Sequence, residues 1–319
     1  MITEKAEQSE QSEDVYQSRN GDKPKIIQRV DPVVYAQTAN PSLITEDLQA
    51  RYERQGFLIL DNVFNEREVD CFRQELNRLN DDKEIKASAE AITELSSDEI
   101  RSLFKIHEIS PVFKRLAADN RLAGLAQHLL NDRVYIHQSR LNYKPGFRGK
   151  EFNWHSDFET WHVEDGMPRM RALSMSIILT ENDQRNGALM LIPGSHKKFV
   201  VCEEETPENH YSVSLKKQEY GIPSDECLAS LVADGGIVSA IGKPGSVLIF
   251  DSNMMHGSNS NITPWPRSNV FFVYNAISNR VTWPFCGLSP RPEYLCSRKA
   301  IRAIEPRPFI AAADQSIYA

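Results

Sequence analysis

The stretch Asn153-Trp-His-Ser-Asp-Phe-Glu-Thr-Trp-His162 decides which fold and chemistry this chain can have. It contains a His-x-Asp pair, His155 and Asp157. Alternate residues of a β-strand point to the same face, so the two side chains are predicted to converge while Ser156 points away. On its own the pair fits a hydrogen-bonded surface turn equally well.

A second histidine, His256, follows a predicted strand that ends near Asp251. A jelly roll can bring that later strand end beside the earlier pair. Two imidazoles and one carboxylate form the ligand set of non-haem Fe(II) oxygenases, which leaves positions open for a bidentate 2-oxo acid and for O₂. Arg267, close behind His256, can supply a bidentate guanidinium to the far carboxylate of that co-substrate.

Simpler interpretations exist for each of these residues taken alone. His256 would fit as a core histidine and Arg267 as a solvated charge. A zinc hydrolase could also use two histidines and an aspartate, although it would not require the arginine. A catalytically silent metal- or ligand-binding barrel would have no need to keep all four residues together. His162 is interpreted as a loop residue and His196 as a turn residue, and both are left out of the ligand set.

The fold class follows from a change of hydrophobic period along the chain. Helices are predicted from Thr45, from the capping box at Asn65, and from Pro111 to about Leu130. After residue 132 the period approaches two, and short strands separated by Gly and Pro turns are predicted at 134–143, 172–179, 188–192, 246–250 and 270–275. The pattern predicts a mainly β protein with flanking helices and a double-stranded β-helix core, the jelly-roll or cupin-like fold.

One predicted strand carries unusual side chains. In residues 134–143 the even-numbered positions, which include Val134, Ile136, Gln138, Arg140 and Asn142, are expected to share a face. Polar residues in the middle of a strand indicate a lined cavity rather than a dry core.

The domain organisation is predicted to be simple. Residues 1–25 are polar and acidic and are expected to form a disordered tail. Residues 26–319 are expected to form a single jelly-roll domain with N-terminal helices. The segment from Cys202 to Ala240 has weak periodicity, and it is either a lid over the site or surface decoration.

Bulk properties restrict the partners and the location. The chain has 319 residues and a formal net charge of −7, which argues against nucleic-acid or anionic-membrane binding. It has no apolar run long enough to span a bilayer, and its start lacks the apolar core of a signal peptide. The expected location is the cytoplasm. The five cysteines form no C-x-x-C pair and are expected to be reduced.

The residues from Phe152 to Pro168 closely resemble the signature of bacterial ectoine hydroxylases, which belong to the phytanoyl-CoA dioxygenase superfamily. The resemblance continues through Pro193–His196, Phe250–Asn253 and Trp283–Phe285 and covers roughly residues 30–305. It implies Fe(II)- and 2-oxoglutarate-dependent hydroxylation of ectoine, a compatible solute of osmotic and thermal stress, to 5-hydroxyectoine. O₂ would be consumed, succinate and CO₂ would be released, and the enzyme would be a homodimer.

The resemblance also implies roles for individual residues. His155, Asp157 and His256 match the iron ligands, while Arg267, Lys144 and Phe152 match the 2-oxoglutarate pocket. Positions that hold ectoine are matched by Gln138, Trp161, Arg291, Ser174 and Phe271. Ectoine is a small zwitterion, so an aromatic face could meet its amidinium cation and an arginine its carboxylate. An oxygenase of the same fold that acts on another small polar molecule is the alternative.

Overall fold

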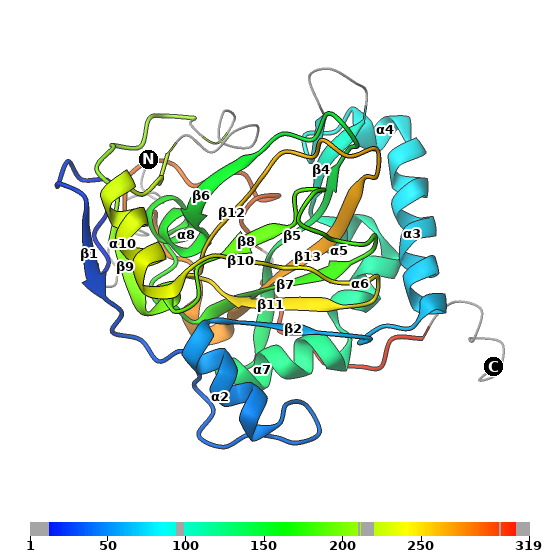
Figure 1. Ribbon diagram of the computed structural model, residues 1–319, viewed down its shortest axis with the longest axis horizontal. Helices are drawn as coiled ribbons and strands as arrows, with labels where there is room; N and C mark the ends of the chain where they lie inside the picture. Colours follow the sequence, from blue (N-terminus) through cyan, green and yellow to red (C-terminus); the bar gives the residue numbers. More distant parts are fainter. Residues whose placement is uncertain (1–12, 94–98, 210, 212–219, 300, 311–319) are drawn as a thin grey trace.

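Two antiparallel β-sheets build the centre of the molecule (Figure 1). The computed structural model describes residues 13–93, 99–209, 211, 220–299 and 301–310. One sheet has the strand order β2-β11-β7-β13-β5-β4-β3, the second has the order β10-β8-β12-β6, and β1 pairs with β9. The strands are β1 Lys25–Gln28, β2 Phe57–Leu60, β3 Ala91–Thr93, β4 Ile100–Phe104, β5 Val134–Lys144, β6 Phe152–Ser156, β7 Ala172–Ile178, β8 Leu189–Leu191, β9 Lys198–Val201, β10 Val238–Ser239, β11 Val247–Asp251, β12 Met255–Ser258 and β13 Arg267–Ala276.

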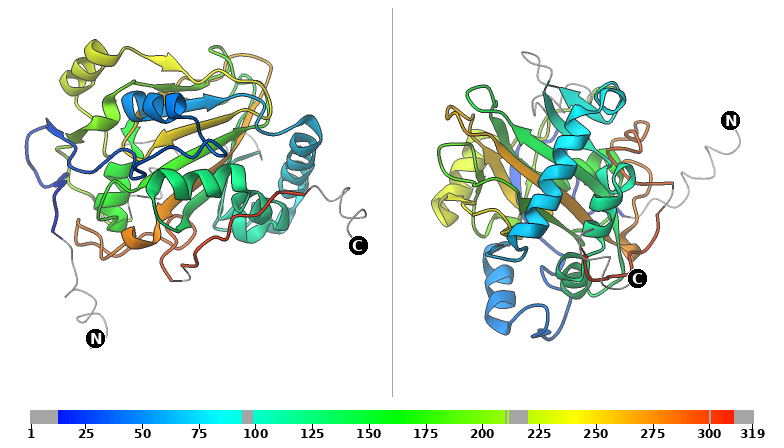
Figure 2. Two further views of the ribbon diagram at one scale, coloured as in Figure 1. Left: turned by 90° about the horizontal axis from the view of Figure 1, so that it is seen from below. Right: turned by 90° about the vertical axis from the view of Figure 1, so that its right-hand side faces the viewer.

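Helices cover the outer face of the seven-stranded sheet, and α3 crosses in front of it in the right-hand view of Figure 2. The helical elements are α2 Glu46–Gln55, α3 Glu66–Asp81, α4 Lys83–Lys86, α5 Ile106–Ile109, α6 Pro111–Ala117, the π-helix η2 Asn120–Gly124, α7 Leu125–Leu130, α8 Asp157–Asp165, the 3₁₀-helix η3 Ser195–Lys197, α10 Asp225–Gly235 and the 3₁₀-helix η4 Ile277–Asn279.

Strand β11 shows how the residue pattern builds the layers. Its residues Val247 and Ile249 pack in the core beneath the helices. The alternate residues Leu248 and Phe250 instead pack with Leu191 of β8, in the second sheet. This alternation places one hydrophobic layer between helices and sheet and another between the two sheets. The prediction of a jelly-roll core with flanking helices is confirmed.

The helix starts follow the predicted capping chemistry. The Thr45 side chain accepts a hydrogen bond from Leu48 N, and Asn65 forms a complete capping box with Glu68. The predicted helix from Pro111 to Leu130 is wrong in its continuity, because α6 ends at Ala117. Asp119 interrupts it by forming a bridge with Arg307 before the π-helix and α7 resume the helical course.

The predicted alternation along β5 is correct only in its second half. Gln138, Arg140 and Asn142 line a pocket between the sheets, but Val134 and Ile136 pack beneath the helices on the opposite face. The cause is a bulge, because the pairing with β13 jumps from Gln138 to Ile136 across Val273 and Tyr274. An extra residue in one strand reverses the face of the sheet to which the side chains beyond it point.

The expected tail is ordered over the residues that the structure describes. Tyr16 has no exposed surface, and Arg19 is 5% exposed. Arg19 forms ion pairs with Glu159 and Glu164 of α8, and its backbone N–H donates to Cys202 O. The prediction of disorder up to residue 25 is therefore wrong for residues 13–25, because burial depends on α8, which is remote in sequence. Residues 1–12 lie outside the described residues.

Replacing Arg19 with methionine should lower the free energy of unfolding by about 3–5 kcal/mol, because Glu159 would remain buried without a cation and Glu164 would keep only its longer contact with Arg291. Urea unfolding of the metal-free protein measures this. The control is Lys25→Met, because the Lys25–Asp22 pair is about half exposed, with side-chain exposures of 54% and 49%. Loss of such a pair costs at most about 1 kcal/mol. Equal midpoints for the two variants would contradict the structural role of Arg19.

The segment 202–240 is only partly described. It contains α10, and Tyr211 lines the pocket between the sheets. Residues 210 and 212–219 lie outside the described residues. The choice between lid and surface decoration therefore stays a prediction.

Candidate active site

Three potential metal ligands converge at the end of the smaller sheet. His155 lies on β6 and His256 directly opposite it on β12. Asp157 Oδ1 is 3.7 Å from His155 Nε2, and Asp157 Oδ2 is 4.0 Å from His256 Nε2. The three ligand atoms lie within 4.8 Å of one another, and all three residues are buried. The predicted convergence of the two sequence segments is confirmed.

Both imidazoles are oriented by the backbone. His155 Nδ1 is 2.8 Å from Asn153 O, and His256 Nδ1 is 2.8 Å from Met254 O. A carbonyl oxygen can only accept, so each Nδ1 carries the proton, and in the neutral ring Nε2 holds a free lone pair. Burial lowers the pKa of His155 to about 3 and lowers that of His256 as well. Two neutral nitrogen donors and a carboxylate therefore face one point, as a ferrous ion requires.

Asp157 does not belong to the strand, as the sequence pattern suggested, but is the first residue of α8. The alternation nevertheless extends to it, because Ser156 keeps an extended backbone with φ −108° and ψ 128°. The helix start also puts Trp161 one turn after Asp157 on the same side of α8. Both residues line the pocket.

Arg267 lies at the start of β13 on the opposite wall of the pocket. Its Nη1 donates to Gly187 O over 2.7 Å and its Nη2 to Asn142 Oδ1 over 3.2 Å, while its buried Nε has no partner. Burial lowers the pKa of Arg267 to about 10, with a contribution from Arg140, so the guanidinium is charged at neutral pH. Among the described side chains no carboxylate pairs with it. This buried cation with an unused donor fits a dicarboxylic co-substrate.

The other two residues expected around the co-substrate also line this pocket. The Phe152 ring centroid lies 5.1 Å from that of His155. Lys144 Nζ donates to Ser258 Oγ over 2.9 Å and also to the carbonyl of Asn259. In the pairing of β5 with β13, Lys144 stands directly opposite Arg267. Lys144 and Arg267 therefore both line the pocket that contains the metal-ligand cluster.

Four of the five residues expected to hold the substrate line the same pocket: Gln138, Trp161, Phe271 and Arg291. Gln138 Nε2 donates to Leu295 O over 2.8 Å, which leaves Oε1 as an acceptor. Ser174 is not among the lining residues. It lies on β7 behind the cluster, and its Oγ is 3.5 Å from Asp157 Oδ2.

Arg291 is already engaged by acids of α8. Its Nε and Nη2 donate to the two oxygens of Asp165 over 2.8 and 2.6 Å, and Nη1 lies 3.4 Å from Glu164 Oε2. Burial opposes ionisation of Asp165, but Arg291 and His137 outweigh it and hold the pKa of Asp165 well below its usual range. Asp165 therefore occupies Nε and Nη2, and a ligand would meet Arg291 at Nη1, where the contact with Glu164 is longer. Asp165 also lies near Cys296 and His137, and Arg291 accounts for its charge without a second metal.

Sequence reasoning assigned no role to Arg140, which lines the pocket on β5. Its guanidinium carbon lies 5.0 Å from the centre of the Phe271 ring, and burial lowers its pKa. No carboxylate among the described residues forms an ion pair with it. Its position on the polar face of the strand was the signal that could have identified it.

His162 is correctly excluded from the ligands, but its assignment to a loop is wrong. It is a fully buried residue of α8. Its ring stacks on Phe285 at 4.1 Å, and its two nitrogens contact Met167 O and Asp14. His196 lies in the short helix η3, where Nε2 contacts Glu53 O.

Known proteins match both the sequence and this geometry. The family model of phytanoyl-CoA dioxygenase matches residues 52–269. The ectoine dioxygenase of Bordetella bronchiseptica is 52% identical over 295 residues, which cover 92% of this chain and 96% of that protein. The ectoine dioxygenase of Sphingopyxis alaskensis is 54% identical over 286 residues, which cover 90% of this chain and 94% of that protein.

Solved structures agree with these relatives. The crystal structure of EctD from S. alaskensis with 2-oxoglutarate and 5-hydroxyectoine superposes with a TM-score of 0.85 and 48% identity, and covers 94% of this chain and all of that one. The carbocyclase SnoK, at 17% identity and a TM-score of 0.56, shares the fold alone. The chain therefore belongs to the phytanoyl-CoA dioxygenase family and, within it, to the ectoine dioxygenases.

Proposed function

We propose that this protein hydroxylates ectoine to 5-hydroxyectoine in a reaction that depends on Fe(II) and 2-oxoglutarate. One O₂ is consumed for each turnover. One of its oxygen atoms enters the hydroxyl group and the other enters succinate, and the carboxyl carbon of 2-oxoglutarate leaves as CO₂. The S. alaskensis structure that contains 2-oxoglutarate and 5-hydroxyectoine supports this substrate pair for a protein of the same family.

The observation that carries the proposal is one pocket with two complementary features. His155, Asp157 and His256 aim three donor atoms at one point, and Arg267 presents a buried, unpaired Nε on the opposite wall. A zinc hydrolase needs only the first feature, and an anion-binding barrel needs only the second. A 2-oxo acid oxygenase needs both.

In this proposal His155, Asp157 and His256 hold the ferrous ion, which supplies O₂ activation coupled to oxidation of 2-oxoglutarate. Arg267 binds the far carboxylate of 2-oxoglutarate, and its fixed guanidinium sets the distance between that carboxylate and the ligand cluster. Lys144 adds a second positive charge. Phe152 packs beside His155 and keeps water from that side of the co-substrate.

Ectoine is placed by complementary charge in the remaining part of the pocket. Trp161 offers its ring to the amidinium cation, and Gln138 Oε1 accepts a hydrogen bond from an amidinium N–H. The carboxylate meets a cationic wall formed by Arg140 and the Nη1 edge of Arg291. Phe271 supplies an apolar surface, and Ser174 acts through Asp157 rather than by touching the substrate.

The proposal is tested by anaerobic titration with Fe(II) and 2-oxoglutarate, which should produce the visible charge-transfer band of the chelate. Addition of ectoine and O₂ should then yield 5-hydroxyectoine and succinate in equal amounts. Proline, a small zwitterion without an amidinium group, is the control substrate. Turnover of another solute but not of ectoine would favour an oxygenase with a different substrate. Absence of the band would instead favour a catalytically silent barrel.

Replacing Trp161 with leucine should raise the ectoine KM roughly 10- to 30-fold, because a desolvated cation–π contact is worth up to about 2 kcal/mol. The 2-oxoglutarate dissociation constant, measured from the anaerobic band, should not change. Phe158→Leu is the matched control, because Phe158 is in the same helix and hydrophobic cluster but does not line the pocket. A similar KM change in both variants would mean that Trp161 acts only through packing.

Cytoplasmic location and a homodimeric assembly remain predictions of the sequence and the resemblance. Among the residues described, none of the helices is both long and apolar enough to cross a membrane. The net charge of −7 is consistent with a small-molecule substrate and opposes a nucleic-acid partner.

A further inference from the structure

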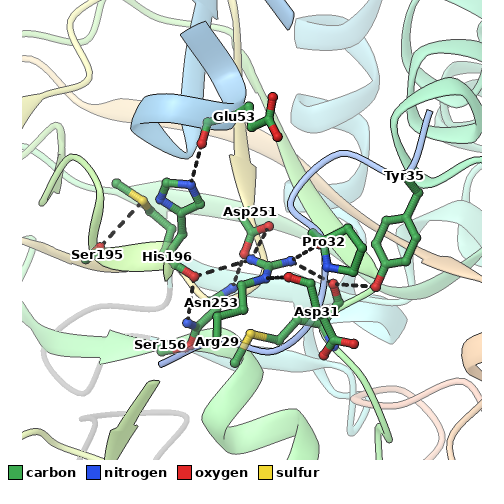
Figure 3. A network of polar contacts seen from close by, with 12 residues as sticks. Arg29, Asp31, Pro32, Tyr35, Glu53, Ser156, Ser195, His196, Asp251 and Asn253 are labelled. Carbon is green, nitrogen blue, oxygen red and sulfur yellow. Dashed lines mark hydrogen bonds and ion pairs between the residues drawn. The ribbon is translucent and has the colours of Figure 1, made fainter. Parts of the chain in front are cut away.

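A buried polar network connects Ser156 with Asn253, Asp251 and Arg29, none of which lines the pocket (Figure 3). It begins at Ser156, the residue between the ligands His155 and Asp157. Ser156 Oγ donates to Asn253 Oδ1 over 2.9 Å, and the two residues are 5% and 2% exposed. Asn253 lies three positions before His256. This bond therefore joins the two segments that carry all three ligands.

The backbone joins these segments on either side of Asp157, through the β6–β12 ladder and through Phe158 N, which donates to Ser252 O over 2.8 Å. Strands β6 and β12 pair through His155 and His256, but the ladder ends where Met255 faces Ser156. Asp157 lies beyond that point, at the first position of α8. The Ser156–Asn253 bond therefore lies where the chain passes from β6 into α8, directly before Asp157.

The Asn253 amide has a single possible orientation. Its Nδ2 donates to His196 O and Lys198 O, each over 3.0 Å, and its backbone N–H donates to Asp251 Oδ1 over 2.8 Å. Two carbonyl oxygens can only accept, so the nitrogen must face them and Oδ1 must face Ser156. The amide is fully used and cannot flip without leaving buried donors unpaired.

Asp251 is in turn anchored by Arg29, which follows β1. Arg29 Nη1 lies 2.8 Å from Asp251 Oδ2, and the two side chains are 3% and 2% exposed. The remaining guanidinium donors go to the backbone, with Nε to Asp31 O and Nη2 to Pro32 O and Met170 O. Figure 3 shows Arg29, Asp251, Asn253 and His196 as one connected group. Arg29 lies outside residues 52–269, which match the family model.

We propose that Asn253 is a positioning residue, which holds Ser156 so that Asp157 and the two histidines are set for the ferrous ion before it binds. The inference rests on the proposed role of the three residues as iron ligands. It goes beyond that role because neither Ser156 nor Asn253 lines the pocket or belongs to the metal-ligand cluster. Loss of such an outer partner typically weakens metal binding by about 10–100-fold.

The test measures Fe(II) affinity by anaerobic titration in saturating 2-oxoglutarate, together with the thermal midpoint of the metal-free protein. Ser156→Ala and Asn253→Ala should each weaken Fe(II) binding about 10–100-fold. The double variant should be no weaker than the weaker single variant, because both changes remove the same bond. Ser156→Thr, which keeps the hydroxyl, should restore most of the affinity.

Asn275→Ala is the matched control. Asn275 is also a fully buried asparagine, and its Nδ2 donates to Tyr135 Oη and Asn279 O. Its replacement should lower the thermal midpoint about as much as Asn253→Ala does, without changing Fe(II) affinity. If Ser156→Ala and Asn253→Ala lose only thermal stability and bind Fe(II) like the wild type, the positioning role is overturned. Should Asn253→Ala fail to fold, Ser156→Ala, which removes a single oxygen, decides the question.

The outcome is separable from that of the proposed function. A wild-type protein that gives no Fe(II)–2-oxoglutarate band would refute the metal site itself. If the wild type gives the band and the variants give it at the same Fe(II) concentration, only the role of Asn253 is refuted.

Discussion

Replacing His155 with alanine should abolish ectoine hydroxylation, because only His256 and Asp157 would remain to hold Fe(II). The bond from Nδ1 to Asn153 O turns Nε2 toward Asp157, and alanine has no donor atom in that place. Product formation at saturating Fe(II), 2-oxoglutarate and ectoine measures the effect. The anaerobic visible band should disappear as well, which separates loss of metal from loss of substrate.

The control for this variant is His107→Ala. His107 is a half-buried histidine whose Nδ1 lies 2.6 Å from Ser139 Oγ, and it does not line the pocket. The control should keep turnover and the band. Near-normal turnover in His155→Ala, with its thermal midpoint intact, would disprove the role of His155 as a ligand.

Replacing Arg267 with alanine should raise the requirement for 2-oxoglutarate far more than the requirement for ectoine. Loss of one partner of a buried, hydrogen-bonded charge pair typically costs about 2–5 kcal/mol, or roughly 30-fold to several thousand-fold in affinity. Arg267 is 3% exposed, so water cannot replace its guanidinium efficiently. The 2-oxoglutarate dissociation constant from the anaerobic band and the two KM values measure the effect.

Arg267→Lys should lie between the wild type and the alanine variant, because an ammonium keeps the charge but lacks the bidentate fork. It would also lose one of the bonds to Gly187 O or Asn142. Equal increases in the KM for 2-oxoglutarate and for ectoine in Arg267→Ala would count against the assignment.

The features that could be predicted from the sequence are those set by residues close together in the chain. His155 and Asp157 are two positions apart, and an extended Ser156 is enough to bring their side chains together. Thr45 and Asn65 mark the starts of their helices, because each side-chain oxygen accepts a hydrogen bond from the backbone N–H three residues later. Four strands of the larger sheet, β5, β7, β11 and β13, were predicted from their apolar residues, but β3 and β4 were not.

The sequence could not predict what depends on distant partners. The bulge in β5 arises from its pairing with β13, and nothing within residues 134–143 marks it. Tyr16 and Arg19 stand in a polar segment, and their burial follows from α8, more than a hundred positions away. The engagement of Arg291 by Asp165 was hidden for the same reason.

The buried arginines of the N-terminal segment bear on how much of the chain can fold alone. Glu159 and Glu164 receive their counter-charge from Arg19, and Asp251 receives its counter-charge from Arg29. A fragment that began at residue 52, where the family match starts, would leave Glu159 and Asp251 buried without these cations, and Glu164 with Arg291 alone. We therefore expect the span shared with the wider family to be less stable alone than within this protein.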